Sequence, residues 1–373
     1  MTMNDTLMIT STQGLLELAD RLQGEKILAC DLEADSLHRY QEKVCLLQFS
    51  TPKFSALVDP LAVPDLSPLA SLMANPLIRK VFHGADYDVR SLHRDFAIEI
   101  KNIFDTMIAC QFLGVQELGL AAALRKRFGV ELDKQFQKAD WSRRPLSPEM
   151  LAYAAKDTCF LIDFYQQLAG ELQAKGRQAW VAEECSFLEQ VRVSVRDKGP
   201  FYLRFKGAAR FDSRTLAVLE ELLLFRDEQA RQMDRPHFKV IGNEILTELA
   251  IRRPQQIADF GGVKGVSESI VQRHGRGLLR AIRKGCALPE AELPRYPLAL
   301  RPERDPRKDE RLKRLKRWRE KKASELALEP GIFANNVLLE GLAELPDGAA
   351  VSGVIPRNWQ RELFAGEVAR LLG

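Results

Sequence analysis

The chain has 373 residues, too many for one ordinary domain, so we expect two or three compact units. Hydrophobic residues make up 46% of the sequence and charged residues 28%, which excludes extensive disorder, and no apolar run is long enough to span a membrane. The formal net charge of +4 is too small to identify a nucleic-acid-binding protein by itself. Six scattered cysteines without metal-ligand spacing are typical of reduced thiols in a cytoplasmic protein.

Strand-like and helix-like segments alternate along the first half of the chain. An α/β domain with a mixed sheet shows such alternation, and we place it at residues 1–175, followed by a helical connector at 176–210. The predicted strands are 26–32, 44–50, 54–58 and 80–82, and the predicted helices are 66–74, 86–96, 108–113 and 118–128.

Helical periodicity prevails in the second half, which also contains an internal repeat with an offset of 93 residues. Such a repeat predicts two copies of one small helical domain. We place the copies at 211–288 and 308–373, joined by a linker at 289–307 that is rich in proline and charge. The matching pairs include Phe225/Trp318, Arg226/Arg319, Asn243/Asn336, Leu246/Leu339 and Leu249/Leu342.

Two carboxylates, Asp31 and Glu33, stand at the end of the first predicted strand. Because side chains alternate across a strand, both point to the same side. Neighbouring anions at the end of an apolar strand repel each other, and a cation between them would relieve this repulsion. Carboxylate oxygens with no His or Cys nearby suit Mg²⁺ or Mn²⁺. Taken alone, the pair is more typical of a solvated strand end.

A second candidate, Asp88, lies in the first turn of the helix predicted at 86–96. Asp86 is suited to cap this helix, because carboxylates favour helix starts. Asp88 could instead present its carboxylate to a metal ion. Taken alone, capping or solvation is the more common role for either residue.

A third candidate is the pair Tyr153 and Asp157, on a helix whose start is marked by Ser147 and Pro148. A spacing of four residues places the two side chains on one face of the helix. An isolated pair of this kind is usually a partly buried tyrosine beside a surface aspartate. The pair therefore indicates a functional site only in combination with the two acidic segments that precede it.

Together, the three segments resemble the DEDD superfamily of 3′-to-5′ exonucleases, in the subgroup with tyrosine in the third motif. Its first motif is D-x-E, its second an aspartate five residues after a histidine or similar residue, and its third Y-x-x-x-D. His83 and Asp88 match the second motif, which leaves Asp86 as the capping residue. The segment 132–146 further resembles the ribonuclease D family, through a lysine, the pair Asp140-Trp141 and the run Arg144-Pro145-Leu146.

The two helical units resemble the HRDC domain, which is named after helicases and ribonuclease D. The first unit resembles it more closely than the second, which is shorter and more divergent. The resemblance therefore implies a multi-domain protein in which a ribonuclease H-like α/β exonuclease domain precedes two all-α HRDC domains.

The resemblance also implies hydrolysis of phosphodiesters with release of nucleoside 5′-monophosphates. Asp31, Glu33, Asp88 and Asp157 would hold two divalent ions, Mg²⁺ or Mn²⁺, about 3.5–4 Å apart at the scissile phosphate. Tyr153 would orient the attacking water, because a tyrosine with a pKa near 10 is a poor base at neutral pH.

The substrate implied by the family is the single-stranded 3′ end of RNA, usually of tRNA precursors, acted on by a cytoplasmic monomer. His83, Trp141 and Lys156 are candidates for substrate contact, although His83 also fits a core histidine and Lys156 a solvated helix face. A DNA exonuclease or repair-associated nuclease is an alternative, because chemistry at the phosphate ignores the 2′-hydroxyl. The complete set of acidic residues argues against a binding protein with an inactive site.

Positive charge is concentrated in residues 304–322, which contain eleven Lys or Arg and four Asp or Glu. Leu312, Leu315 and Trp318 would form an apolar edge beneath a cationic helix face. Such a face would bind phosphates regardless of base sequence and with strong dependence on salt. A solvated linker helix anchored by the three apolar side chains is the alternative.

Overall fold

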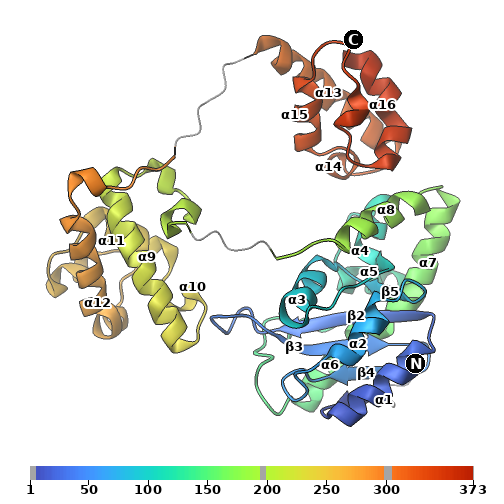
Figure 1. The fold of residues 1–373 in the computed structure, drawn as a ribbon, viewed down its shortest axis with the longest axis horizontal. Coiled ribbons are helices and arrows are strands. Elements are labelled where there is room, and N and C mark those ends of the chain that lie inside the picture. Colours follow the sequence, from blue (N-terminus) through green and yellow to red (C-terminus); the bar gives the residue numbers. More distant parts are fainter. Residues whose placement is uncertain (1–5, 194–198, 298–304, 373) are drawn as a thin grey trace. The chain divides into compact units, whose positions relative to one another are not determined.

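The computed structural model describes residues 6–193, 199–297 and 305–372 (Figure 1). These residues fall into two compact units. One unit combines residues 6–34, 43–193 and 305–372, and the other combines residues 35–42 and 199–297. No helix in the described part of the chain is long and apolar enough to cross a lipid bilayer.

A six-stranded mixed sheet lies at the centre of the N-terminal domain, which confirms the predicted architecture. Its strand order is β1-β4-β3-β2-β5-β6, and β3 runs antiparallel to both neighbours while the other pairs are parallel. The edge strands β1 and β6 were not predicted, because three or four residues carry too little periodicity. The strands are β1 (Thr6–Ile9), β2 (Ile27–Ala34), β3 (Val44–Ser50), β4 (Ser55–Val58), β5 (Arg79–Phe82) and β6 (Ile103–Asp105).

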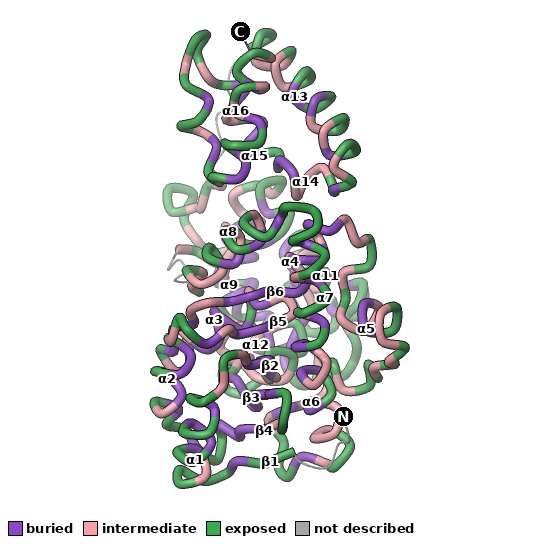
Figure 2. Tube along the Cα trace, turned by 90° about the vertical axis from the view of Figure 1, so that its right-hand side faces the viewer, coloured by how far each residue is buried: buried purple, intermediate pink, exposed green. Residues whose placement is uncertain are grey.

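Helices cover this sheet, and β3 is buried along its whole length (Figure 2). The helix α6 packs over β2, β3 and β4, where Leu46 and Leu57 join a small apolar cluster with Trp141. Leu47 and Phe49 point to the opposite face and belong to the main core. The helices are α1 (Thr12–Gln23), α2 (Ser67–Ala74), α3 (Asp86–Phe96), α4 (Thr106–Leu113), α5 (Leu120–Phe128), α6 (Pro148–Cys159), α7 (Leu161–Ala174) and α8 (Gln178–Leu188).

The second unit is helical and has its own core. Its longest helix, α9 (Ser213–Met233), buries the stripe of Leu216, Leu219, Leu222 and Leu223, as periodicity predicted. The start of the predicted linker is tied to this unit, because the Tyr296 hydroxyl donates to the Leu203 carbonyl at 3.2 Å. The remaining elements are α10 (His237–Val240), α11 (Asn243–Arg252), α12 (Glu268–Ala287) and the 3₁₀ turns Phe201–Arg204, Ala208–Arg210, Ile257–Gly262 and Glu290–Glu292.

The C-terminal helical region repeats the element order of the second unit. Arg226 donates to the Ile241 carbonyl at 3.1 Å and to the Asn243 side chain at 2.7 Å. Arg319 makes the same two bonds, to the Ala334 carbonyl at 3.2 Å and to Asn336 at 2.9 Å. The sequence repeat therefore corresponds to a structural repeat. Its elements are α13 (Pro306–Glu325), α14 (Pro330–Phe333), α15 (Asn336–Glu344), the 3₁₀ turn Val351–Gly353 and α16 (Asn358–Leu372).

This C-terminal region packs on the N-terminal α/β domain, within the same compact unit. Trp359 of α16 stacks on Trp180 of α8 with ring centroids 5.0 Å apart, and its edge meets Phe112 of α4. The Glu183 carboxylate accepts the backbone N–H groups of Asn358 and Trp359 at 2.7 and 3.0 Å. The helix α8, which lies in the predicted connector, is thus part of the N-terminal α/β domain, and the C-terminal region packs on it.

Candidate active site

The strand β2 places Asp31 and Glu33 on one face of the sheet. Asp31 lies directly opposite Gln48 of β3, and Glu33 lies opposite Leu46, so these four side chains share that face. The register shifts by one residue between Glu33 and Ala34, where a β-bulge ends the regular pairing. The two carboxylates therefore lie within the C-terminal half of β2, because the strand continues to Ala34, beyond its predicted end at residue 32.

The start of α3 brings Asp88 to the same place. Gly84, with φ of 84°, makes the turn between β5 and α3, a conformation that favours glycine. The Asp105 carboxylate accepts the N–H groups of Gly84 and Ala85 at 2.9 and 2.7 Å, and it also caps the N-terminus of α4. Asp105 thus positions the turn from which Asp88 projects.

The helix α6 supplies Tyr153 and Asp157. Ser147 caps the helix by accepting the Met150 N–H, and Pro148 occupies its first turn, as predicted. The Thr158 hydroxyl lies 2.7 Å from the Ser50 hydroxyl of β3, which fixes the helix against the sheet face that carries Asp31. The structure therefore brings the three predicted segments together.

The four carboxyls lie close enough to perturb one another. Burial, together with the charges of Asp31, Asp157 and Asp88, raises the pKa of Glu33 to about 9. Burial raises the pKa of Asp157 to about 8 and that of Asp31 to about 6, and it raises the pKa of Asp88 well above its ordinary value. The charge of Asp31 adds to the effect of burial on the pKa of Asp88.

These carboxyls fit a divalent cation by their chemistry. Asp88 is only 7% exposed, and one of its carboxyl oxygens is buried without a hydrogen-bond partner. Four mutually repelling oxygen donors with an unsatisfied buried atom are the surroundings that a hard cation stabilises. In this structure, no three His, Cys, Asp or Glu side chains among residues 6–193, 199–297 and 305–372 are already close enough together to hold a metal ion.

Tyr153 is held as a neutral phenol beside Asp157. Burial and the charge of Asp157 raise the pKa of Tyr153 far above 10, and its hydroxyl donates a hydrogen bond to that carboxylate. The ring packs edge-on against Phe136, with centroids 5.7 Å apart, and against Trp141 at 6.0 Å. The predicted contact between Trp141 and substrate needs correction, because the indole is only 1% exposed and instead supports Tyr153.

The remaining predicted residues differ in exposure. His83 is half-buried, and its Nδ1 lies 2.9 Å from the Thr106 hydroxyl, while burial lowers the pKa of the imidazole. Lys156 is exposed on α6, between buried residues on either side. The prediction that Asp86 caps α3 is wrong, because the helix begins at Asp86 after Ala85 and no side chain caps it; Asp86 instead forms an ion pair with Arg90, one turn along the helix.

Sequence reasoning missed residues that act through hydrogen bonds to distant segments. Arg144 donates to both carboxylate oxygens of Asp59 at 2.6 Å and to the Cys45 carbonyl at 2.8 Å, which ties the segment before α6 to the sheet. Gln48 is fully buried in a strand whose other residues, apart from Ser50, are apolar. A glutamine within such a strand indicates a functional role for its side chain. The residue that it faces, Asp31, is known only from the strand register.

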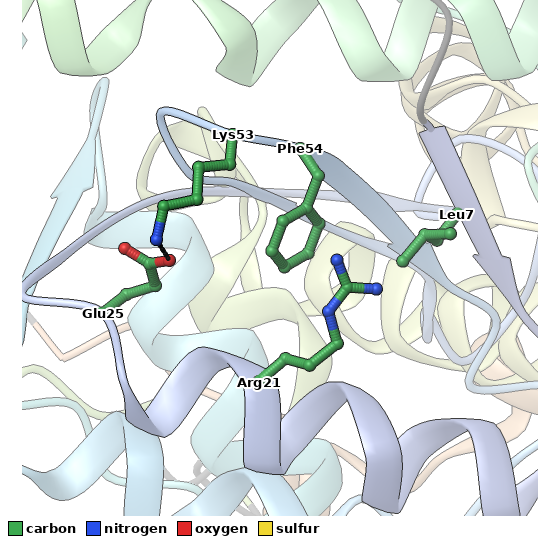
Figure 3. Close-up of a pocket in the computed structure, with 5 residues that line it drawn as sticks. All are labelled: Leu7, Arg21, Glu25, Lys53 and Phe54. Carbon is green, nitrogen blue, oxygen red and sulfur yellow. Dashed lines mark hydrogen bonds and ion pairs between the residues drawn. The ribbon is translucent and has the colours of Figure 1, made fainter.

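A separate hollow lies away from these residues, where α1 meets the loop before β4 (Figure 3). Its volume is about 490 Å³, and the Arg21 guanidinium stacks 4.1 Å above the Phe54 ring. Lys53 and Glu25 form an ion pair of 3.0 Å along its wall. None of the predicted catalytic residues lines this hollow.

Known proteins resemble this chain in both sequence and fold. A family model described as 3′-5′ exonuclease matches residues 6–173, and a model of the HRDC domain matches residues 215–282. A ribonuclease D of Gluconacetobacter diazotrophicus is 31% identical over 78% of this chain and 75% of its own length.

Two solved structures extend this similarity. Escherichia coli RNase D, described as an exoribonuclease involved in structured RNA processing, is 27% identical, with a TM-score of 0.73 over 99% of this chain and 98% of its own. The catalytic core of RRP6 from Trypanosoma brucei is 31% identical, with a TM-score of 0.68 over 76% of this chain and 81% of its own.

These matches narrow the predicted domain composition. The exonuclease domain and one HRDC domain are shown, whereas the HRDC match ends at residue 282 and does not reach the C-terminal helical region. The extent and identity of the ribonuclease D match decide the family. The chain therefore belongs to the ribonuclease D family of 3′-to-5′ exoribonucleases.

Proposed function

We propose that this exoribonuclease uses Asp31, Glu33, Asp88 and Asp157 to hold two divalent ions, with Mg²⁺ or Mn²⁺ as the metal. The observation that carries the proposal is that four carboxyls from β2, α3 and α6 lie close enough to repel one another, and that Asp88 among them has a buried oxygen without a hydrogen-bond partner. Since burial and mutual repulsion raise the pKa of all four carboxyls, ion binding requires any protons that they carry to leave.

The residues around the carboxyls would orient the attacking water and hold the site in place. When bound, divalent ions acidify water and neutralise charge on a phosphate. Tyr153 keeps its proton at neutral pH, so its hydroxyl orients the attacking water and does not act as the base. Trp141 and Phe136 hold the Tyr153 ring in place, and Asp105 holds the turn that carries Asp88.

The proposed substrate is the single-stranded 3′ end of RNA, with tRNA precursors as the cellular example and nucleoside 5′-monophosphates as products. Support comes from the relatives, of which Escherichia coli RNase D is described as acting in structured RNA processing. We place His83 and the exposed Lys156 as substrate contacts at the rim of the site. A monomer in the cytoplasm is the proposed acting form.

Matched end-labelled strands test this function. With Mg²⁺ or Mn²⁺, we expect 5′-labelled RNA to shorten one nucleotide at a time and 3′-labelled RNA to release a labelled 5′-mononucleotide from the start. DNA of the same sequence should be degraded more slowly, and EDTA should stop the reaction. Asp157→Asn, purified identically, controls for contaminating nuclease. Internal cuts, activity in EDTA or faster loss of DNA would each contradict the proposal.

We also propose that the C-terminal helical region is a second, divergent HRDC copy, at 308–373, following the first at 211–288. The Arg319 hydrogen bonds repeat those of Arg226 at an offset of 93 residues, and α14 repeats α10 at the same offset. The predicted linker, 289–307, lies between the two copies in the sequence, and its residues 298–304 are outside the described part of the chain.

The basic helix α13 supports RNA binding by this second copy. Leu315 and Trp318 are buried, whereas Lys313, Arg317 and Lys321 are exposed at four-residue intervals along one face. In the described part of the chain these three cations have no carboxylate partner. We propose that they contact the phosphates of RNA that extends from the active site.

Neutralising these cations should weaken binding without altering chemistry. For Lys313→Gln/Arg317→Gln/Lys321→Gln, we expect the slope of log Kd against log salt for single-stranded RNA in EDTA to fall by about 2, given about 0.7 per phosphate contact. The kcat should stay unchanged. Lys308→Gln/Lys322→Gln is the control, because those lysines pair with Glu344 and with Glu325 and Glu367. An unchanged slope in the triple variant would show that this face does not touch RNA.

A further inference from the structure

Gln48 is a buried polar side chain with no partner. It lies in β3, where all seven residues are buried, and its own exposed fraction is 0%. Neither its amide nitrogen nor its amide oxygen has a hydrogen bond within the described residues. Leaving both ends of a buried amide unsatisfied costs free energy, and a leucine or methionine there would avoid the cost. The presence of glutamine at this position is therefore not explained by packing or stability.

The strand register places this amide beside the carboxyl cluster. Gln48 lies directly opposite Asp31 in the antiparallel pair of β2 and β3, and directly opposite residues on one face have Cβ atoms about 4.5–5.5 Å apart. Ser50, two residues further on the same face, is held by Thr158 of α6. Gln48 is therefore enclosed between the sheet and the helix that supplies Asp157.

We propose that Gln48 is a positioning residue for Asp31, donating its amide N–H to an Asp31 carboxylate oxygen when that carboxylate holds metal. The inference rests on the proposed two-ion function. Carboxylates that ligate a metal are themselves hydrogen-bonded by neighbouring groups, which fix their orientation. A neutral donor can do this next to a cation, whereas a lysine or arginine at position 48 would compete with the ion by charge.

This role explains why a polar glutamine occupies position 48, in a strand whose other residues, apart from Ser50, are apolar. Leu46 lies opposite Glu33, and Leu57 of β4 lies opposite Gln48, so the neighbours on this face offer no other uncharged donor to Asp31. The Ser50 hydroxyl is already engaged with Ser55 and Thr158, both at 2.7 Å. Gln48 is thus the side-chain amide that the sheet itself presents to the metal-binding carboxylate.

Methionine at position 48 tests the proposal, because it keeps the length of glutamine and removes the donor. For Gln48→Met we expect the Mn²⁺ affinity of the RNA-free protein, measured by electron paramagnetic resonance, to fall by about 10–100-fold. The Mg²⁺ concentration for half-maximal activity should rise by the same factor. RNA binding in EDTA should not change, and the Tm in EDTA should equal or exceed that of wild type.

Leu57→Met is the matched control, since it places a methionine in the same layer, directly opposite Gln48, and should leave Mn²⁺ affinity unchanged. Gln48→Leu is the second variant and should reproduce the loss. Mn²⁺ affinity within twofold of wild type in both variants would overturn the proposal. A lower Tm in both Gln48 variants, with the Tm of Leu57→Met unchanged, would also overturn the proposal. The amide would then stabilise the sheet and would not position a metal ligand. Wild type without Mn²⁺ binding would instead overturn the proposed two-ion function.

Discussion

Replacing Asp88 by asparagine is expected to lower kcat/KM on single-stranded RNA by about 10³-fold, because one ligand of the proposed ions is lost. Metal stabilisation of a phosphoryl transition state contributes several kcal/mol, and about 4 kcal/mol corresponds to about 10³-fold in rate. The measurement is the initial rate of mononucleotide release with saturating Mg²⁺. Wild type and variant must be compared at equal RNA concentration below KM.

The same substitution should not destabilise the fold. Asp88 is buried among carboxyls whose charges oppose its ionisation, so a neutral amide of the same shape relieves repulsion. We therefore expect the Tm of Asp88→Asn in EDTA to equal or exceed that of wild type. Function and stability would then change in opposite directions, which separates a metal ligand from a residue that merely supports the fold.

Asp86→Asn is the matched control, two residues earlier on the same helix. Asp86 is 48% exposed and pairs with Arg90, so its loss should change kcat/KM by less than about twofold, and surface substitutions typically alter stability by less than about 0.5 kcal/mol. If both variants lost activity equally, the effect would come from the start of α3 and not from the Asp88 carboxylate. Full activity in Asp88→Asn would contradict the two-ion proposal itself.

Replacing Trp359 by alanine should have the largest effect on stability. The indole is 3% exposed, stacks on Trp180, and donates its Nε1–H to the Glu184 carboxylate at 2.9 Å. Removal of a buried tryptophan costs about 3–5 kcal/mol, and here the loss also leaves Glu184 with one donor fewer. We expect urea unfolding to show this loss in the transition that reports the C-terminal region.

Leu363→Ala serves as the control on the same helix, because Leu363 is 38% exposed and its loss should cost less than about 0.5 kcal/mol. A double-mutant cycle with Trp180→Ala isolates the stacked pair, for which we expect a coupling of about 0.5–1.5 kcal/mol. Additive effects of Trp180→Ala and Trp359→Ala would show that the two rings do not pack together in solution.

Much of the candidate site could be read from the sequence because its chemistry is local. Asp31 and Glu33 share a face because a strand has a period of two, and Tyr153 and Asp157 share one because a helix has a period of 3.6. Ser147 and Pro148 marked the start of α6 for equally local reasons. The repeat at an offset of 93 residues likewise predicted the paired helical regions before any contact was known.

Other features depend on contacts between distant segments and were decided only by the tertiary structure. Trp141 was grouped with substrate contacts by its motif, yet packing of the segment before α6 buries it behind Tyr153. Glu183 lies in the predicted connector, yet its carboxylate accepts the first backbone N–H groups of α16. Local sequence cannot reveal such pairings, because burial and hydrogen bonding depend on which surface each element meets.

The sequence by itself determined which groups are available to hold metal: two carboxylates on one strand, a third on the turn of a helix, and a fourth four residues after a tyrosine. Only the tertiary structure decided that they meet, because strand register and helix packing set their distances. It also decided that Gln48 faces Asp31. A one-residue shift in the pairing of β2 and β3 would turn that amide to the opposite face of the sheet.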